Sequence, residues 1–227
     1  MKHRIISIVA LLCLTLLSFA ARAEQFEAVY SLEGTNSSEA TAAFEDLFSD
    51  PALNGSKVTL YAADFGVGVG SHKVVVDYSS YDNRAQRDNM RRESHGWARY
   101  LLAMQDAEFL DANMASVVAD YGQPRHTAGY LIAYMLEVRD PAAYVAAMAE
   151  LNKAAGNPGV LRIVAMRSGS RAVTHAVLIG GDNFSAVQKY MDKLFASDAF
   201  GDFAEKVSDI RSVVRIESYR RLGAWGY

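Results

Sequence analysis

The sequence predicts an α+β protein made of two tandem copies of one β-α-β-β-α-β unit. Two observations support this fold class. Short motifs recur in the same order at an almost constant separation, and segments with strand periodicity alternate with segments of helical periodicity. Of the 227 residues, 51% are hydrophobic and only 4 are proline, so the composition suits a protein with a sizeable core.

The first two elements of each copy are a strand and a helix. YSLE at residues 30–33 corresponds to YMLE at 134–137, 104 residues later, and both runs are β-prone. Each is followed by an apolar stripe with i, i+4, i+7 spacing, which indicates a helix. The stripes are Ala40, Phe44 and Leu47 in the first copy and Tyr144, Met148 and Leu151 in the second.

Two strands follow in each copy. KVTLYAA, from Lys57, corresponds to VLRIVAM, from Val160, and His72 corresponds to His175, 103 residues later, each before an apolar run. The intervening FGVGVGS, residues 65–71, superficially resembles a phosphate-binding loop. We predict a flexible hairpin instead, because no helix start follows to hold an anion.

The last helix and strand are clearer in the second copy. Phe184, Val187, Met191 and Leu194 share a helical face, and VVRIESYRR at 213–221 reads as the closing strand. In the first copy we predict a helical region over 82–114. This region would be about a dozen residues longer than its counterpart and would contain an arginine-rich insert. SVVADY at 116–121 would be the closing strand, and RRLGAWGY at 220–227 a tail that docks on the body or forms a dimer contact.

The N-terminus predicts export. KHR at 2–4 precedes an apolar run over 5–21, and ARA at 21–23 has the small-x-small pattern that signal peptidase accepts. We therefore divide the chain into a signal peptide (1–23), a first repeat with the arginine-rich helical insert (24–124) and a second repeat (125–227). We expect a soluble periplasmic or secreted protein without a stable membrane anchor after cleavage.

The cysteine content and the net charge limit which chemistry and which binding partners can be expected. Cys13, the only cysteine, lies in the predicted signal peptide, so the mature chain has no thiol for a disulfide or for catalysis. The whole chain has net charge −3, and residues 1–23 carry three basic residues and no acidic one, which leaves −6. Nucleic acid is therefore an unsuitable partner. A small-molecule ligand or another exported protein is expected instead.

Two repeats of this kind resemble a known superfamily. The β-α-β-β-α-β order is the ferredoxin-like motif, and two such repeats in one chain resemble the dimeric α+β barrel superfamily over the whole mature chain. The resemblance implies an intrachain barrel in which two sheets pack face to face with the helices outside. Members include cofactor-free monooxygenases, haem-binding chlorite dismutases, dye-decolorising peroxidases and proteins without an assigned reaction. Fold alone therefore selects no reaction.

Strand alternation separates the side chains of the predicted sheets into two faces. We expect the apolar face to pack under the helices; it comprises Val58, Leu60, His72, Val74, Val76, Leu161, Ile163, His175, Val177 and Ile179. We expect the polar face to point between the sheets or to solvent; it comprises Ser31, Glu33, Thr59, Tyr61, Lys73, Asp77, Glu137, Arg162, Arg215 and Glu217. Any charge buried there must be paired.

The polar face is the predicted ligand site. Arg162 or Arg215 would hold a carboxylate or enolate, and Tyr61 or Tyr219 would supply hydrogen bonds. The alternative is that these residues form salt bridges that keep the sheets in register. His72 and His175 are the catalytic candidates, as proton-transfer groups near the rim. The alternative for these two is a turn or sheet-edge role inherited by duplication.

Other candidates are weaker. A haem-binding version would need a helical histidine as axial ligand, and His95 is that residue; otherwise no cofactor is expected. No metal-ligand spacing occurs, so no metal site is predicted. Arg84, Arg87 and Arg91 lie near one helical face and could receive an anion, but interleaved acidic residues favour a solvated face.

These observations leave two function classes. The first is an exported small-ligand-binding or protein-interaction module without catalysis. The alternative is a barrel enzyme of the cofactor-free monooxygenase or haem-binding type.

Overall fold

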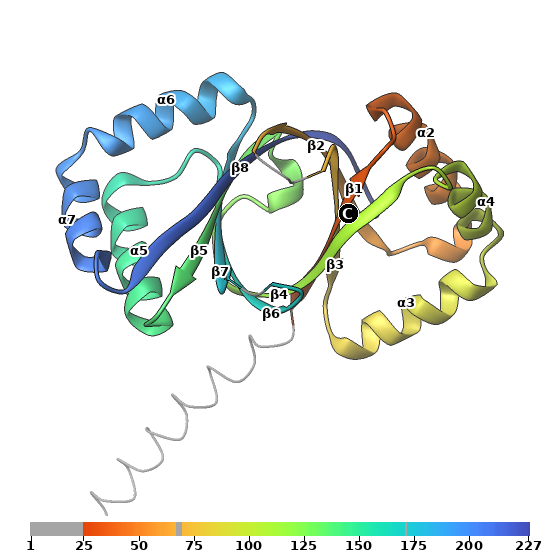
Figure 1. Ribbon diagram of the computed structural model, residues 1–227, viewed down its shortest axis with the longest axis horizontal. Coiled ribbons are helices and arrows are strands. Elements are labelled where there is room, and N and C mark those ends of the chain that lie inside the picture. Colours follow the sequence, from red (N-terminus) through yellow and green to blue (C-terminus); the bar gives the residue numbers. More distant parts are fainter. Residues whose placement is uncertain (1–24, 67–69, 171) are drawn as a thin grey trace, which may run out of the picture.

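The computed structural model describes residues 25–66, 70–170 and 172–227. The predicted signal peptide, residues 1–23, and the centre of the glycine-rich loop lie outside these ranges. Figure 1 shows two groups of helices on opposite sides of a central ring of strands. Among the described residues, no helix has both the length and the apolar character needed to cross a membrane.

Both repeats have the predicted order of elements, with two helices before each closing strand. The first repeat contains β1 (Phe26–Glu33), α2 (Ser37–Phe48), η1 (Pro51–Leu53), β2 (Lys57–Phe65), β3 (His72–Tyr78), α3 (Tyr81–Glu93), α4 (His95–Ala103) and β4 (Glu108–Gly122). A connector turn, η2 (Arg125–Thr127), leads to the second repeat. That repeat contains β5 (Tyr130–Val138), α5 (Pro141–Ala155), β6 (Val160–Ser168), β7 (His175–Gly181), α6 (Phe184–Phe195), α7 (Asp198–Val207) and β8 (Arg211–Trp225).

The strands form a closed antiparallel barrel in the order β1-β3-β2-β8-β5-β7-β6-β4. Within each repeat the order is that of a ferredoxin-like sheet. The sheets do more than pack face to face, because β2 pairs with β8 and β4 pairs with β6. The closing strand of each repeat thus completes the edge of the other. The predicted fold class, two ferredoxin-like repeats forming an intrachain α+β barrel, is confirmed.

The duplication is more regular than the sequence suggested. β3 and β7, α3 and α6, α4 and α7, and β4 and β8 each begin 103 residues apart. The predicted excess of a dozen residues is therefore wrong, and the arginine-rich stretch is α3 with the start of α4 rather than an insert. Strand β4 begins at Glu108, where we predicted helix. Pairing of this segment with β1 overrides the helical preference of residues such as Ala112, which lies opposite Tyr30.

The C-terminal segment is a strand, not a tail. β8 runs to Trp225, whose ring stacks on Phe44 at 5.3 Å and on Phe48 at 5.7 Å between centroids. The Tyr227 hydroxyl hydrogen-bonds to Thr59 Oγ1 at 2.9 Å and to the Asp77 carboxylate. Residues at the end of the second repeat thus pack against the first repeat.

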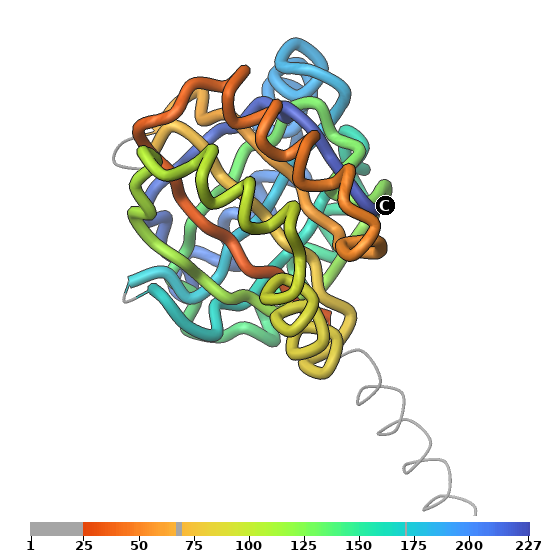
Figure 2. The backbone as a smooth tube through the Cα atoms, turned by 90° about the vertical axis from the view of Figure 1, so that its right-hand side faces the viewer, coloured from red at the N-terminus to blue at the C-terminus, as the bar shows by residue number. Residues whose placement is uncertain are grey.

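Helix starts are set by side-chain caps. Asp140 accepts a hydrogen bond from the Ala143 amide at 3.0 Å at the start of α5, and Asn183 accepts one from the Ala186 amide at 3.0 Å at the start of α6. Each cap satisfies a backbone donor that has no partner within the helix. Figure 2 shows the first repeat's helices lying across the outside of the strands.

The two faces of the strands divide as predicted. Val58, Leu60, Val74 and Val76 pack with residues of α2 and α4 in one core cluster. Leu161, Ile163, Val177 and Ile179 pack with α5, α6 and α7 in another. On the other face, Ser31, Thr59, Tyr61, Lys73, Arg162 and Glu217 are buried, whereas Glu33 and Glu137 lie exposed at strand ends.

Candidate functional site

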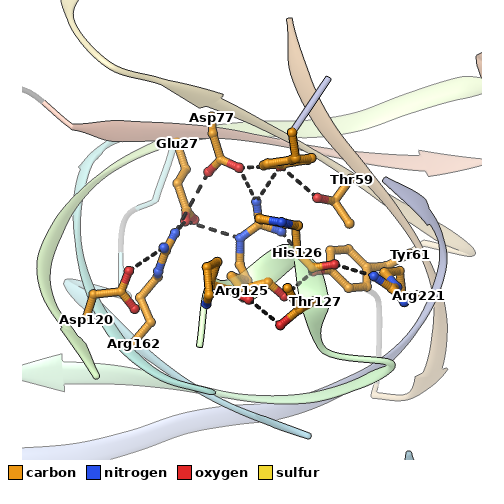
Figure 3. Close-up of polar contacts among 12 residues, drawn as sticks. Glu27, Thr59, Tyr61, Asp77, Asp120, Arg125, His126, Thr127, Arg162 and Arg221 are labelled. Atoms are coloured by element: carbon orange, nitrogen blue, oxygen red, sulfur yellow. Dashed lines mark hydrogen bonds and ion pairs between the residues drawn. The ribbon is translucent and has the colours of Figure 1, made fainter. Parts of the chain in front are cut away.

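One end of the barrel holds a buried ion network (Figure 3). Its centre is Arg125, on the connector turn and 2% exposed. Arg125 Nη2 donates to Asp77 Oδ2 at 2.7 Å, Nε to Glu27 Oε1 at 3.3 Å and Nη1 to the Tyr61 hydroxyl at 2.9 Å. Burial lowers the pKa of Arg125, but Tyr61, Asp77 and Glu27 raise it by more. The guanidinium is therefore charged and paired.

Arg162 extends this network to the second repeat. Its Nη2 donates to Asp120 Oδ2 at 2.5 Å, and its Nη1 contacts Glu27. Burial lowers the pKa of Arg162, but Glu27 and Asp120 raise it above the ordinary value. Burial raises the pKa of Asp77, yet Arg125, the Tyr227 hydroxyl and Arg162 hold it below its usual range. Two guanidinium groups thus neutralise most of three carboxylates without a ligand.

The barrel interior beyond the network encloses a cavity of about 80 Å³. Three of the predicted ligand-binding residues, Tyr61, Arg215 and Tyr219, line it, whereas Arg162 does not. Arg215 Nε and the Tyr219 hydroxyl both donate to Glu217, and Lys73 donates to Ser31. These polar groups are satisfied by one another. Since a water occupies about 30 Å³ of liquid, the space suits a few waters better than an organic ligand.

The histidines lie away from this interior. His72 Nε2 is 3.1 Å from Ser37 Oγ, and its Nδ1 is 2.9 Å from Ser71 Oγ. His175 Nδ1 is 2.9 Å from Thr174 Oγ1. Both rings occupy the helix-facing side of their strands, as the alternation predicted, at strand starts.

The other two histidines that the structure describes are His95 and His126. His95 is exposed at the first position of α4. His126, on the connector turn η2, is half-buried, with its ring stacked on that of Tyr227 at 3.7 Å between centroids.

Larger cavities lie between the sheet and the helices, one in each repeat. The first-repeat cavity has a volume of about 180 Å³. Its aromatic lining consists of Tyr30, Phe44, Phe48, Trp97, Tyr100 and Phe109. The second-repeat cavity measures about 240 Å³ and is lined at equivalent positions by residues that include Tyr134, Met148, Phe200 and Phe203. Duplication has therefore produced two similar apolar cavities.

Each helix–sheet cavity has one arginine in its lining. In the second repeat it is Arg211, whose guanidinium lies 5.4 Å from the Phe203 ring centroid. In the first repeat it is Arg91, with Nη2 donating to the Tyr78 hydroxyl at 3.1 Å and Nη1 3.2 Å from Asp88 Oδ1. Its guanidinium lies 5.1 Å from the Trp97 ring centroid, in cation–π contact. Burial raises the pKa of Tyr100 to about 12 and raises that of Tyr30, so both hydroxyls are neutral donors at neutral pH.

Sequence reasoning missed these cavities and the role of Arg125. The aromatic residues at helical and strand spacing were a signal for the first-repeat cavity, but the same spacing is typical of core packing. The connector GQPRHTAG carried no signal that its arginine is buried inside the barrel.

Comparisons with solved structures establish the fold. A protein assigned provisionally as a monooxygenase, from Fusobacterium nucleatum, matches with a TM-score of 0.62 and 11% identity over 89% of this chain and 94% of that one. A second protein assigned in the same way, from Lactobacillus acidophilus, matches at 0.57 and 10% over 89% and 95%. A chlorite dismutase variant from Candidatus Nitrospira defluvii matches at 0.52 and 9% over 88% and 92%. The chain has the dimeric α+β barrel fold. No family model and no curated protein matches it.

The two helix–sheet cavities are small for haem. A haem iron needs an axial ligand such as His, Cys, Met or Tyr; among the described residues these two linings contain no histidine or cysteine, and the groups of these types that they do contain are tyrosines and, in the second repeat, Met148 and Met191. Both volumes are also below the roughly 300–1,000 Å³ of pockets for drug-sized ligands. His95, the predicted axial ligand, lines neither cavity. Within the described ranges, no three His, Cys, Asp or Glu side chains are grouped to hold a metal.

Proposed function

We propose that the protein binds a small apolar molecule in the first-repeat cavity, between the sheet and helices α2, α3 and α4. The observation that carries this proposal is the lining, in which aromatic rings surround a space of about 180 Å³ and one guanidinium, Arg91, stands in the wall. An apolar wall with a few placed polar groups is typical of ligand sites. A single-ring aromatic compound has a suitable size. With the signal peptide expected at 1–23, binding would occur in the periplasm or outside the cell.

Binding without catalysis is the simpler reading of this lining. The alternative is a barrel enzyme of the monooxygenase type, which is the provisional assignment of two proteins with a similar structure. A cofactor-free oxidation would begin with removal of a proton from the bound molecule, which calls for a base within hydrogen-bond reach. In the part of the chain that the structure describes, the lining contains no carboxylate and no imidazole. Oxygen consumption by the protein with a bound phenol would favour the enzyme.

The two cavities allow a matched test of binding. Trp97 lines the first-repeat cavity and Trp225, the other tryptophan, stacks on two of its wall residues. We expect 4-tert-butylbenzamide to change the tryptophan fluorescence of the wild type in a saturable way. Val74→Phe fills the first cavity and should weaken binding at least about tenfold, or about 1.4 kcal/mol.

The control is Val177→Phe, at the equivalent position of the second-repeat cavity. It should change the affinity less than about twofold, although overpacking costs both variants about 1–3 kcal/mol of stability. No saturable signal in the wild type, or equal effects of the two substitutions, would contradict the proposal.

A further inference from the structure

We propose that the ligand of the first-repeat cavity is an organic monoanion, with its apolar body between the aromatic rings, its carboxylate or equivalent oxyanion held by Arg91 in the wall, and the buried positive charge of Arg87 behind that wall. This inference rests on the proposed function and specifies its ligand class. It reverses our expectation from the sequence that the arginines of α3 form a solvated face.

Arg87 is a buried cation without a counter-ion. The residue is 8% exposed. Its Nε donates to Asn83 Oδ1 at 3.1 Å and its Nη2 donates to the Gly55 carbonyl, both neutral acceptors. Its Nη1 is buried and has no hydrogen-bond partner, and no carboxylate lies within 4.0 Å of the guanidinium among the described residues. A buried charge without a partner is costly, so an anion bound here would offset that cost.

Arg91 places a second guanidinium beside the first. It lies one helical turn after Arg87, so the two side chains share a face of α3. Burial lowers the pKa of Arg87, and Arg91 lowers it further by repulsion. Arg91 lines the cavity, and Ser56, next to the Gly55 carbonyl that Arg87 contacts, lines it too. Arg91 therefore stands in the wall of an otherwise apolar space, and Arg87, which does not line the cavity, lies one helical turn away behind that wall.

The other charged groups of α3 do not cancel this pair. Asp88 is the acid within salt-bridge distance of Arg91, and the same carboxylate is also 3.7 Å from Arg84. One carboxylate is thus shared between two guanidinium groups on the exposed side of the helix. Around the cavity, the other polar groups of the lining are the hydroxyls of Tyr30, Ser56 and Tyr100 and the indole N–H of Trp97, all of which can donate to an anion.

The second repeat lacks the same groups. At the separation of 103 residues, Arg87 corresponds to Tyr190 and Arg91 to Leu194, and Leu194 lines the second-repeat cavity where Arg91 lines the first. The apolar wall is common to both repeats, and the second-repeat cavity has one arginine in its lining, Arg211 at the start of β8. The two guanidinium groups one turn apart on a helix occur in the first repeat.

A matched pair of ligands tests the charge. 4-tert-Butylbenzoate and 4-tert-butylbenzamide have nearly the same shape and differ by one negative charge. We expect the wild type to bind the benzoate at least about tenfold more tightly, by tryptophan fluorescence and by calorimetry. Arg87→Gln and Arg91→Gln should each weaken benzoate binding about 10–100-fold and change amide binding less than about threefold, because each removes a positive charge that attracts the benzoate and not the neutral amide.

Arg92→Gln is the control, since Arg92 is an exposed arginine of the same helix. It should leave both affinities unchanged within about twofold. If Arg87→Gln does not fold, Arg91→Gln and the charge-retaining Arg87→Lys carry the test, and Arg87→Lys should retain part of the preference for benzoate. Equal affinities for benzoate and amide, or unchanged benzoate binding in Arg91→Gln, would overturn the inference while leaving a neutral ligand site intact. Failure of both ligands to bind would overturn the proposed function as well.

Discussion

His72 and His175 occupy equivalent positions in the two repeats. Each ring lies at the start of a strand on the helix-facing side, and each shares a hydrogen bond with the hydroxyl of the residue before it. Burial lowers the pKa of both imidazoles, with Glu33 opposing the shift at His72. Lowered pKa values and a hydrogen bond to the preceding hydroxyl suit a structural role at the strand start. Their proton-transfer role remains a hypothesis.

This burial predicts a pH dependence of stability. An unfolded imidazole has a pKa near 6.5 and the folded value is lower, so the unfolded state binds more protons as the pH falls below about 6.5. The free energy of unfolding should therefore decrease between pH 7 and pH 5, by at most about 1.4 kcal/mol per pH unit for each ring. Urea unfolding of the double variant His72→Gln, His175→Gln should show a shallower dependence. His95→Gln, an exposed control, should leave it unchanged; equal slopes in all three proteins would refute the assignment.

At the scale of elements, the two long closing strands join the repeats. β4 and β8 are each 15 residues long, and each pairs along one side with its own repeat and along the other with the partner repeat. The end of β8 also carries Trp225 onto α2. Gly223 permits this, because a side chain there would meet the indole ring of Trp225, at 2.3 Å from its nearest atom. Gly223, in the segment that we predicted to be a tail, is thus needed for close packing.

Removing this aromatic contact should destabilise the first repeat. Trp225→Ala loses two stacked ring contacts and opens a gap against α2, so we expect a loss of about 2–3 kcal/mol in the free energy of unfolding. Phe65→Ala, which removes a ring that is 66% exposed, should cost less than about 0.5 kcal/mol. Chemical denaturation followed by circular dichroism measures both. A Trp225→Ala protein as stable as the Phe65→Ala control would show that the C-terminus is only loosely attached.

The elements differ in how far the sequence determines them. The strand faces were predictable because alternation has a period of two. Shifting β3 by one residue would place Val74 among the polar groups of the barrel interior and Lys73, without a partner, in the apolar core under the helices. The N-terminal part of β4 was not, because Leu110 and Ala112 favour a helix locally and become strand through pairing with distant strands. The burial of Arg87 also depends on how deeply α3 packs against the Gly55 turn. The spacing of residues along α3 does not predict how deeply the helix packs.

At the scale of the whole molecule, the ion network ties the two repeats into one unit. Arg125 comes from the connector and contacts Glu27 and Asp77 of the first repeat, while Arg162 joins Glu27 to Asp120 across the β4–β6 seam. The barrel is also closed by hydrogen-bonded strand pairs at both seams. The predicted units 24–124 and 125–227 therefore share one interior. We expect the chain to unfold in a single transition rather than repeat by repeat.

Arg125→Met tests whether this network stabilises the barrel. The substitution leaves Glu27 and Asp77 buried beside only Arg162, and breaking a buried pair by removing one partner costs about 3–5 kcal/mol. Arg139→Met, at an exposed arginine, should cost less than about 0.5 kcal/mol. Adding Asp77→Asn to Arg125→Met should cost less than the sum of the single changes, because each already disrupts the same pair. Strict additivity would mean that Arg125 and Asp77 do not stabilise the barrel as a pair. Two separate unfolding transitions in the wild type would mean that the repeats unfold independently.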